Sequence, residues 1–191
     1  DPPESDLERR FVDDPPGGTT HPGVAAAVRA AADLLADAGH EIVSATPPDY
    51  EAVIDHWADL LRADIGVNRA LLDMVMGEDG RAVLDLLMSS GPPPSLELSA
   101  HVQIERYRIM RAWSAFFAEH PIILSPTWGH PPFEHDADVH DTDQHLRDTL
   151  RPITPANFLG LPAAVVPCGT AGGLPVGVQV IGDRFTDLRC L

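Results

Sequence analysis

The sequence predicts an α/β fold, in which helices flank both faces of a mixed β-sheet. A strand, a helix and a second strand follow one another within residues 11–45, which indicates a right-handed crossover between parallel strands. Residues 49–119 carry apolar side chains mainly at helical spacing. Two β-prone runs, 163–167 and 176–181, flank a glycine-rich turn and predict an antiparallel strand pair. A chain of 191 residues can bury about two thirds of its unfolded surface, which is enough for one core.

The parallel unit begins with residues 11–12, which we expect to be the end of a strand. Thr20 or His21 can cap the helix that follows, and a proline in its first turn is favourable there because no partner for its missing N–H is needed. Gly39 ends this helix, and residues 41–45 form the next strand. The apolar residues at helical spacing are Val24, Ala27, Val28, Ala31, Leu34, Leu35 and Ala38.

The middle of the chain is predicted to be helical. Residues 49–87 have mixed helical spacing, and we expect two or three short helices with breaks near Gly66 and Gly77. Residues 91–94 are a firm break, after which Ser95 starts a long helix. The apolar stripe of that long helix comprises Leu98, Val102, Ile109, Trp113 and Phe116.

Residues 122–124 predict a short buried strand that ends at Pro126. Residues 127–143 have little periodicity and many Pro, His and Asp residues, so we interpret them as a surface loop. Four histidines, His130, His135, His140 and His145, recur there at intervals of five among acidic residues. That interval scatters side chains on a helix and alternates them between the faces of a strand, so we favour a solvated acidic loop over a metal cluster and expect no metal site.

The terminal strand pair has its turn at residues 169–173, where glycines allow the positive φ angles of tight turns. In the last strand Val176, Val178 and Val180 share one face. Thr186 can start another helix, yet the sequence stops before two further turns are complete. We therefore expect the chain to be part of a longer one.

The stretch from Arg151 to Asp183 resembles the C-terminal hallmark of the amidase signature family, and a looser resemblance runs through the whole chain. The family pattern is T-x-P-x-N-x-x-G-x-P-A, then an apolar strand into P-x-G, then G-L-P-V-G-x-Q. One departure is that Thr154 and Pro155 are adjacent. The matching residues are Thr154, Pro155, Asn157, Gly160, Pro162, Ala163, Pro167, Gly169, Gly173, Leu174, Pro175, Val176, Gly177 and Gln179.

The resemblance implies that residues 1–191 are a single region, the C-terminal portion of an amidase domain. Such enzymes hydrolyse amide bonds with two serines and a lysine on an upstream glycine- and serine-rich segment, and they need no cofactor. This chain lacks that segment, and all 13 of its Lys and Arg residues are arginine. We therefore expect no catalytic residue in this chain. The implied partners are a small-molecule amide substrate and a missing N-terminal half of the same enzyme.

Candidate site residues cluster after the strand that ends at Pro126. By the resemblance, this strand leads into a loop that borders the substrate cavity, which makes Thr127, Trp128 and Phe133 candidate substrate contacts; packing within their own loop is the alternative. Asn157 is a further candidate, although bracing the backbone is the favoured role of its amide. Other polar groups suggest no chemistry: Ser125 is a strand-end hydroxyl, Cys168 is a small buried hydrophobe, and the glycines at 169–173 lack the lysine of a phosphate loop.

Composition excludes several classes of partner. A formal charge of −16 opposes binding to nucleic acid and to anionic lipid, and no apolar run approaches a membrane span. No signal peptide is visible, so the expected location is the cytoplasm. The sequence is also compatible with a homodimer. The alternative function is a non-catalytic pseudoenzyme or partner-binding module. Apolar residues on both faces of the last two strands favour burial within a larger body instead.

Overall fold

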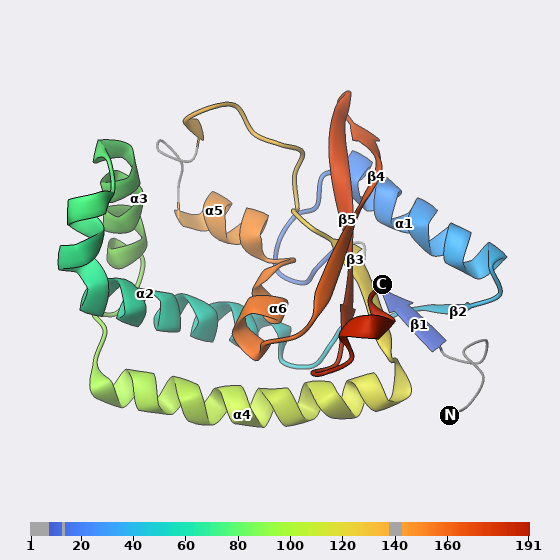
Figure 1. The fold of residues 1–191 in the computed structure, drawn as a ribbon, viewed down its shortest axis with the longest axis horizontal. Helices are drawn as coiled ribbons and strands as arrows, with labels where there is room; N and C mark the ends of the chain where they lie inside the picture. The colour runs from blue at the N-terminus through green and yellow to red at the C-terminus, as the bar shows by residue number, and fades with distance from the viewer. Residues whose placement is uncertain (1–7, 13, 138–142) are drawn as a thin grey trace.

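The computed structural model describes residues 8–12, 14–137 and 143–191, and Figure 1 shows the arrangement of its elements. The strands are β1 (Glu8–Phe11), β2 (Glu41–Ser44), β3 (Ile122–Pro126), β4 (Ala163–Ala171) and β5 (Leu174–Gly182). The helices are α1 (Pro22–Asp37), α2 (Tyr50–Val75), α3 (Glu78–Ser89), α4 (Leu96–Glu119), α5 (Asp143–Leu150), α6 (Thr154–Leu159) and a short 3₁₀ helix, η3 (Asp187–Arg189).

The strands form one five-stranded mixed sheet in the order β2-β1-β3-β5-β4. β1 is parallel to both β2 and β3, which confirms the predicted β1–α1–β2 crossover. β5 is antiparallel to β3 and to β4, so the predicted terminal strand pair is also confirmed. β4 continues to Ala171, past its predicted end at residue 167, across an irregularity in the pairing between Pro167 and Thr170.

Helices cover both faces of the sheet, as predicted (Figure 1). On one face α1 packs Val24 and Val28 against Leu124 and Val178. On the other face α2, α4 and α6 enclose a larger core. Because successive strand residues point to opposite faces, Leu124 and Ile123 belong to different clusters. The buried members of the larger core are Val12, Tyr50, Val53, Ile54, Val102, Ile109, Trp113, Phe117, Ile123, Phe158, Leu159, Leu161 and Ile181.

One expectation about the helical middle is wrong. The predicted break near Gly66 does not occur, and α2 runs unbroken from Tyr50 to Val75. A Cβ atom at Gly66 would lie 3.1 Å from Cγ of Pro94, so this glycine provides close packing rather than a helix end. The apolar stripe predicted for α4 packs against the core, with Phe116 partly buried; Phe117, which the stripe did not include, is buried as well. The predicted break at Gly77 and the N-cap at Ser95 are confirmed, and Ser95 Oγ accepts a hydrogen bond from the Leu98 N–H at 3.1 Å.

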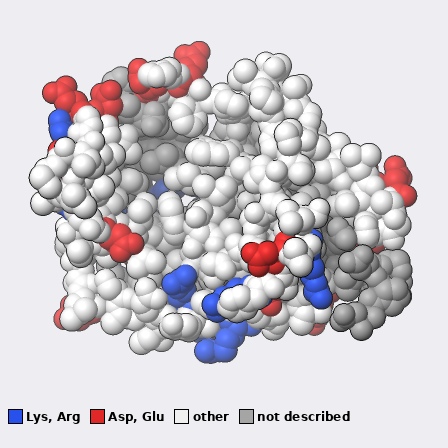
Figure 2. All heavy atoms as spheres, in the orientation of Figure 1, with Lys and Arg blue, Asp and Glu red and all other residues white. Residues whose placement is uncertain are grey.

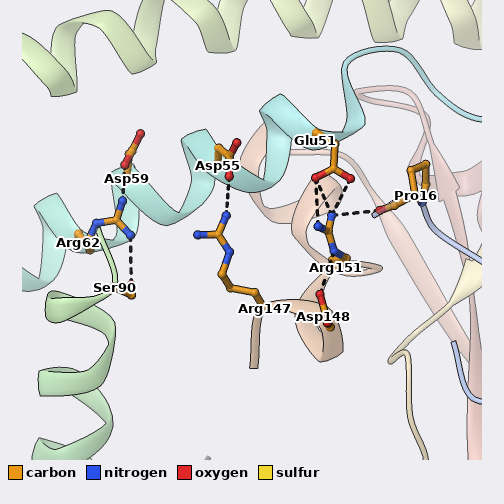
Figure 3. Close-up of polar contacts among 9 residues, drawn as sticks. All are labelled: Pro16, Glu51, Asp55, Asp59, Arg62, Ser90, Arg147, Asp148 and Arg151. Atoms are coloured by element: carbon orange, nitrogen blue, oxygen red, sulfur yellow. Dashed lines mark hydrogen bonds and ion pairs between the residues drawn. The ribbon is translucent and has the colours of Figure 1, made fainter. Parts of the chain in front are cut away.

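A ladder of ion pairs joins α2 to α5 and to the residue after it (Figure 3). Glu51 and Asp55 lie one turn apart on α2, and they face Arg151 and Arg147, which are also four residues apart. Arg151 makes a two-pronged contact: Nη1 lies 3.0 Å from Glu51 Oε1, and Nη2 lies 3.0 Å from Oε2. The matched spacing fixes α5 antiparallel to the start of α2.

Arg151 also holds elements beyond α2. Its Nη1 donates to the carbonyl oxygen of Pro16 at 3.0 Å, and its Nε lies 3.3 Å from Asp148 Oδ1. The phenol of Tyr50 donates to the Arg151 carbonyl oxygen at 3.0 Å. Arg151 therefore ties the loop before α1, the start of α2 and the turn before α6 to one another.

The two arginines of the ladder should contribute differently to the free energy of unfolding. The partners Glu51 and Asp55 are similarly exposed, at 55% and 64%, but the Arg151 side chain is 8% exposed and that of Arg147 is 24% exposed. Arg151→Ala should lower the free energy of unfolding by about 1.5–3 kcal/mol, because it removes several charged hydrogen bonds that a buried guanidinium makes, one of them to the Pro16 carbonyl oxygen. Arg147→Ala should cost less than about 1 kcal/mol. Urea unfolding followed by circular dichroism measures both values, and equal losses would contradict the assignment of Arg151 as the anchor.

Burial of Tyr50 predicts a loss of stability at alkaline pH. Burial raises the pKa of the Tyr50 phenol well above its usual range. The unfolded phenol ionises near pH 10 while the folded one keeps its proton, so the free energy of unfolding should fall as the pH rises above about 10. Burial also raises the pKa of the Cys190 thiol, with the same sign. Urea titrations at pH 8 to 11 give the free energy of unfolding of the wild type and of Tyr50→Phe. The difference between the two isolates the contribution of the Tyr50 phenol. Tyr107→Phe, at an exposed position, is the control and should keep the wild-type slope.

Candidate functional site

A hollow of about 440 Å³ lies beyond the end of β3, between the segment that follows this strand and the hairpin of β4 and β5. Its size falls within the usual range for small-molecule sites, about 300–1,000 Å³. Three of the four predicted substrate contacts, Thr127, Trp128 and Phe133, lie in its wall. The complete lining consists of Thr127, Trp128, His130, Pro131, Pro132, Phe133, Val165, Pro175, Val176 and Gly177.

The floor of the hollow depends on the pairing of β3 with β5. Pro126 is opposite Val178 in the register, and the Thr127 N–H donates to the Gly177 carbonyl oxygen at 3.2 Å, which keeps the chain on β5 as it leaves the strand. A Cβ atom at Gly177 would lie 2.9 Å from Thr127 Oγ1 and 3.1 Å from Val165 Cγ1. A glycine is therefore needed for this close approach.

The outer wall is aromatic. The rings of Trp128 and Phe133 meet edge to face, with centroids 6.0 Å apart and planes inclined by 63°. About half of the Phe133 side chain is exposed, so a molecule entering the hollow can reach it. Paired aromatic rings of this kind present a rigid apolar surface to a ligand.

The polar character of the hollow is concentrated in few groups. No described lining residue is an Asp, Glu or Arg, and His130 is the ionisable one among them. Thr127 Oγ1 is buried and makes no hydrogen bond to any described residue. An unpaired buried hydroxyl costs about 1–3 kcal/mol of stability. Figure 2 shows acidic side chains gathered at the α3 end of the face in view, with basic ones mainly in its lower half.

Gln179 lies behind this wall, on β5. Its Nε2 donates to Ser125 Oγ at 3.0 Å and to the carbonyl oxygens of Pro126 and Pro152 at 2.9 and 2.6 Å. Sequence reasoning did not identify this role. The sequence does show a polar residue, Gln179, inside an apolar strand. A buried amide at such a position must have hydrogen-bond partners, and this could have indicated its role. Ser125, which we interpreted as a strand-end hydroxyl, is buried and contacts Gln179 and the Pro126 carbonyl oxygen.

The other candidate residues lie apart from the hollow. Asn157 is on α6, where its Nδ2 donates to the Ile153 carbonyl oxygen at 3.0 Å. Cys168 is half-buried in β4, with its Sγ 3.4 Å from the Ala27 carbonyl oxygen. The structure thus brings Thr127, Trp128 and Phe133 together and places Asn157 elsewhere.

The histidine-rich segment divides between described and undescribed parts. His130 lines the hollow, and His135 is exposed, with Nδ1 2.8 Å from Asp136 Oδ1. His140 and the side chain of His145 lie outside the described residues. Within the described part of the chain, no three His, Cys, Asp or Glu side chains are grouped to hold a metal ion. Over the same part, no helix combines the length and apolar character needed to cross a membrane.

The family model for amidases matches residues 11–191, and the chain therefore belongs to the amidase family. It is 30% identical over 170 residues to an indoleacetamide hydrolase from Bradyrhizobium japonicum, covering 87% of this chain and 37% of that protein. It is 30% identical over 199 residues to a glutamyl-tRNA(Gln) amidotransferase subunit from Salinispora arenicola, covering 91% of this chain and 40% of that protein. The chain thus spans about two fifths of the length of these relatives.

A solved structure gives the same fold. A fatty acid amide hydrolase aligns with a TM-score of 0.74 at 15% identity, over 97% of this chain and 38% of that one. The amidase signature assignment and the α/β fold class expected from the sequence are both confirmed.

Removing the Thr127 hydroxyl should cost no stability. Because Oγ1 has no partner among the described residues, Thr127→Val should leave the free energy of unfolding unchanged or raise it by up to about 1 kcal/mol. Thr154→Val is the matched control: the Thr154 hydroxyl donates to the Leu150 carbonyl oxygen at 2.9 Å, and its loss should cost about 1 kcal/mol. Thermal and urea unfolding of the two variants make the comparison. Equal losses would show that the Thr127 hydroxyl is already bonded.

Proposed function

We propose that this chain is the C-terminal portion of an enzyme that hydrolyses carbon–nitrogen amide bonds, and that the hollow beyond β3 binds the apolar part of the substrate. The observation that carries the proposal is the aromatic hollow of about 440 Å³ in a chain of the amidase family. Trp128 and Phe133 supply its outer wall, and Gly177 keeps its floor open.

The catalytic serine belongs to a segment outside these 191 residues. The chain contains no lysine to complete a Ser-Ser-Lys relay, and Ser125 is tied to Gln179. In the complete enzyme the serine attacks the amide carbonyl carbon, backbone N–H groups stabilise the oxyanion, the amine leaves, and water then releases the acid. The residues of this chain bind and orient the substrate.

The lining favours a neutral substrate with a flat apolar group. An ammonium group in the hollow would find no Asp or Glu among the described lining residues, and a carboxylate would find no Arg, with His130 as the one ionisable side chain there. An aromatic group stacks or packs edge to face on Trp128 and Phe133. Indoleacetamide, which the name of one relative gives as its substrate, has this combination of groups.

The rest of the enzyme covers the open side of β4. This strand is at the edge of the sheet, and Val166, which does not line the hollow, is about half exposed. Apolar side chains on an edge strand recruit another chain or segment. The segment that carries the serine is the proposed occupant, and the complete protein acts in the cytoplasm on small-molecule amides.

The proposal predicts that activity requires the complete gene product. The chain of residues 1–191 alone should not hydrolyse indole-3-acetamide, should not react with a serine-directed fluorophosphonate and should aggregate or melt broadly. The complete gene product should hydrolyse the amide and react with the fluorophosphonate. In that protein Trp128→Ala should raise KM for indole-3-acetamide about tenfold, equivalent to about 1.4 kcal/mol of lost contact. Phe185→Ala, at an exposed position on the surface, is the control and should leave KM unchanged.

Three results would count against this function. One is fluorophosphonate labelling at Ser125, another is a complete gene product that hydrolyses no amide, and the third is a monodisperse monomer of residues 1–191 with a sharp cooperative melt. The last result would favour the non-catalytic, partner-binding alternative.

A further inference from the structure

Gln179 is a buried amide at the centre of an apolar strand. Its exposed fraction is 2%, and its strand neighbours Val178 and Val180 point to the opposite face of the sheet. Burying a primary amide without partners costs several kcal/mol, so a residue of this kind persists only where its hydrogen bonds are made. Gln179 makes its bonds to oxygens that belong to two other segments of the chain.

Two of those oxygens belong to prolines, which have no backbone N–H. Pro126 and Pro152 lack an N–H, so neither can be held by donating to a neighbour. Each instead accepts from Gln179 Nε2, at 2.9 and 2.6 Å, while Ser125 Oγ accepts at 3.0 Å. A side-chain carboxylate or an apolar side chain has no hydrogen to give these oxygens, whereas the amide nitrogen has two, which the three oxygens share.

The segment held by Gln179 continues directly into the aromatic wall. Pro126 precedes Thr127, whose N–H is bound to the Gly177 carbonyl oxygen. A second anchor follows at Gly129, whose carbonyl oxygen accepts from the His21 N–H at 2.8 Å. Trp128 lies between the two anchors, so its ring orientation depends on both. Loss of one anchor should change the orientation of the Trp128 ring without disturbing the pairing of the strands.

We propose that Gln179 is a positioning residue that sets the orientation of Trp128, and through it the selectivity of the hollow for flat apolar groups. The effect on substrates rests on the proposed function; the effect on the position of residues 127–128 does not. Gln179 touches no ligand in this role. It acts through the Pro126 carbonyl oxygen and the Thr127–Gly177 hydrogen bond.

Hydrogen–deuterium exchange of the complete gene product tests the positioning. Gln179→Met keeps the volume and removes both donor hydrogens, and Gln179→Asn keeps an amide that is one methylene too short. Exchange of the amides at 127–129 should accelerate at least tenfold in the Met variant and less in the Asn variant. Leu84→Ala, which opens a cavity in α3, is the control for general destabilisation and should leave those amides unchanged. Unchanged exchange at 127–129 in both Gln179 variants, or the same acceleration in Leu84→Ala, would overturn the proposal.

Steady-state kinetics separate positioning from simple loss of folded protein. Gln179→Met should raise KM for indole-3-acetamide at least fivefold and leave kcat/KM for acetamide, which does not fill the hollow, within twofold. A parallel loss for both amides would indicate a structural role only and would refute the selectivity claim. If the wild-type protein hydrolyses neither amide, the proposed function fails, and the exchange measurement still decides whether Gln179 positions the wall.

Discussion

The buried guanidinium of Arg151 is the interaction on which the remaining arrangement depends. Its bonds to Glu51 and to the Pro16 carbonyl oxygen hold the turn before α6 against α2 and against the loop before α1. Pro152 is the next residue along the chain, and its carbonyl oxygen reaches Gln179. A buried charge on one side of the fold thus supports a buried amide in the sheet, and the amide supports the loop that lines the hollow.

Elements with strong local signals were predictable from the sequence. The α1 helix begins after His21, which caps it through Nδ1, and α4 begins after Ser95. The terminal strand pair follows from two β-prone runs and glycines with positive φ between them. These features depend on residues a few positions apart. Propensity and turn chemistry act at that range.

Features that depend on distant residues were not predictable in the same way. The cost of a glycine inside a helix, about 1 kcal/mol, suggested a break at Gly66, and packing against Pro94 outweighs it. The pairing of β1 with β3, the bond from Gln179 to Pro152 and the bond from Arg151 to Pro16 join residues 27 to 135 positions apart. Thr127, Trp128 and Phe133 were selected through a family resemblance, and the structure places them around one hollow. Asn157 matched the same motif yet lies outside it, because a motif residue can serve the backbone instead.

The hollow has a floor and a wall of different origin. Its floor is made by Val176 and Gly177 of a strand paired on both sides, and its wall by a loop anchored before Trp128 and at Gly129. Residues 130–133 follow the second anchor and take no part in the pairing of β3 with β5. Mutations in this short stretch can therefore reshape the cavity without a penalty in sheet formation. New substrate preferences would be easier to acquire there, by natural drift or by directed evolution, than at any position on β5.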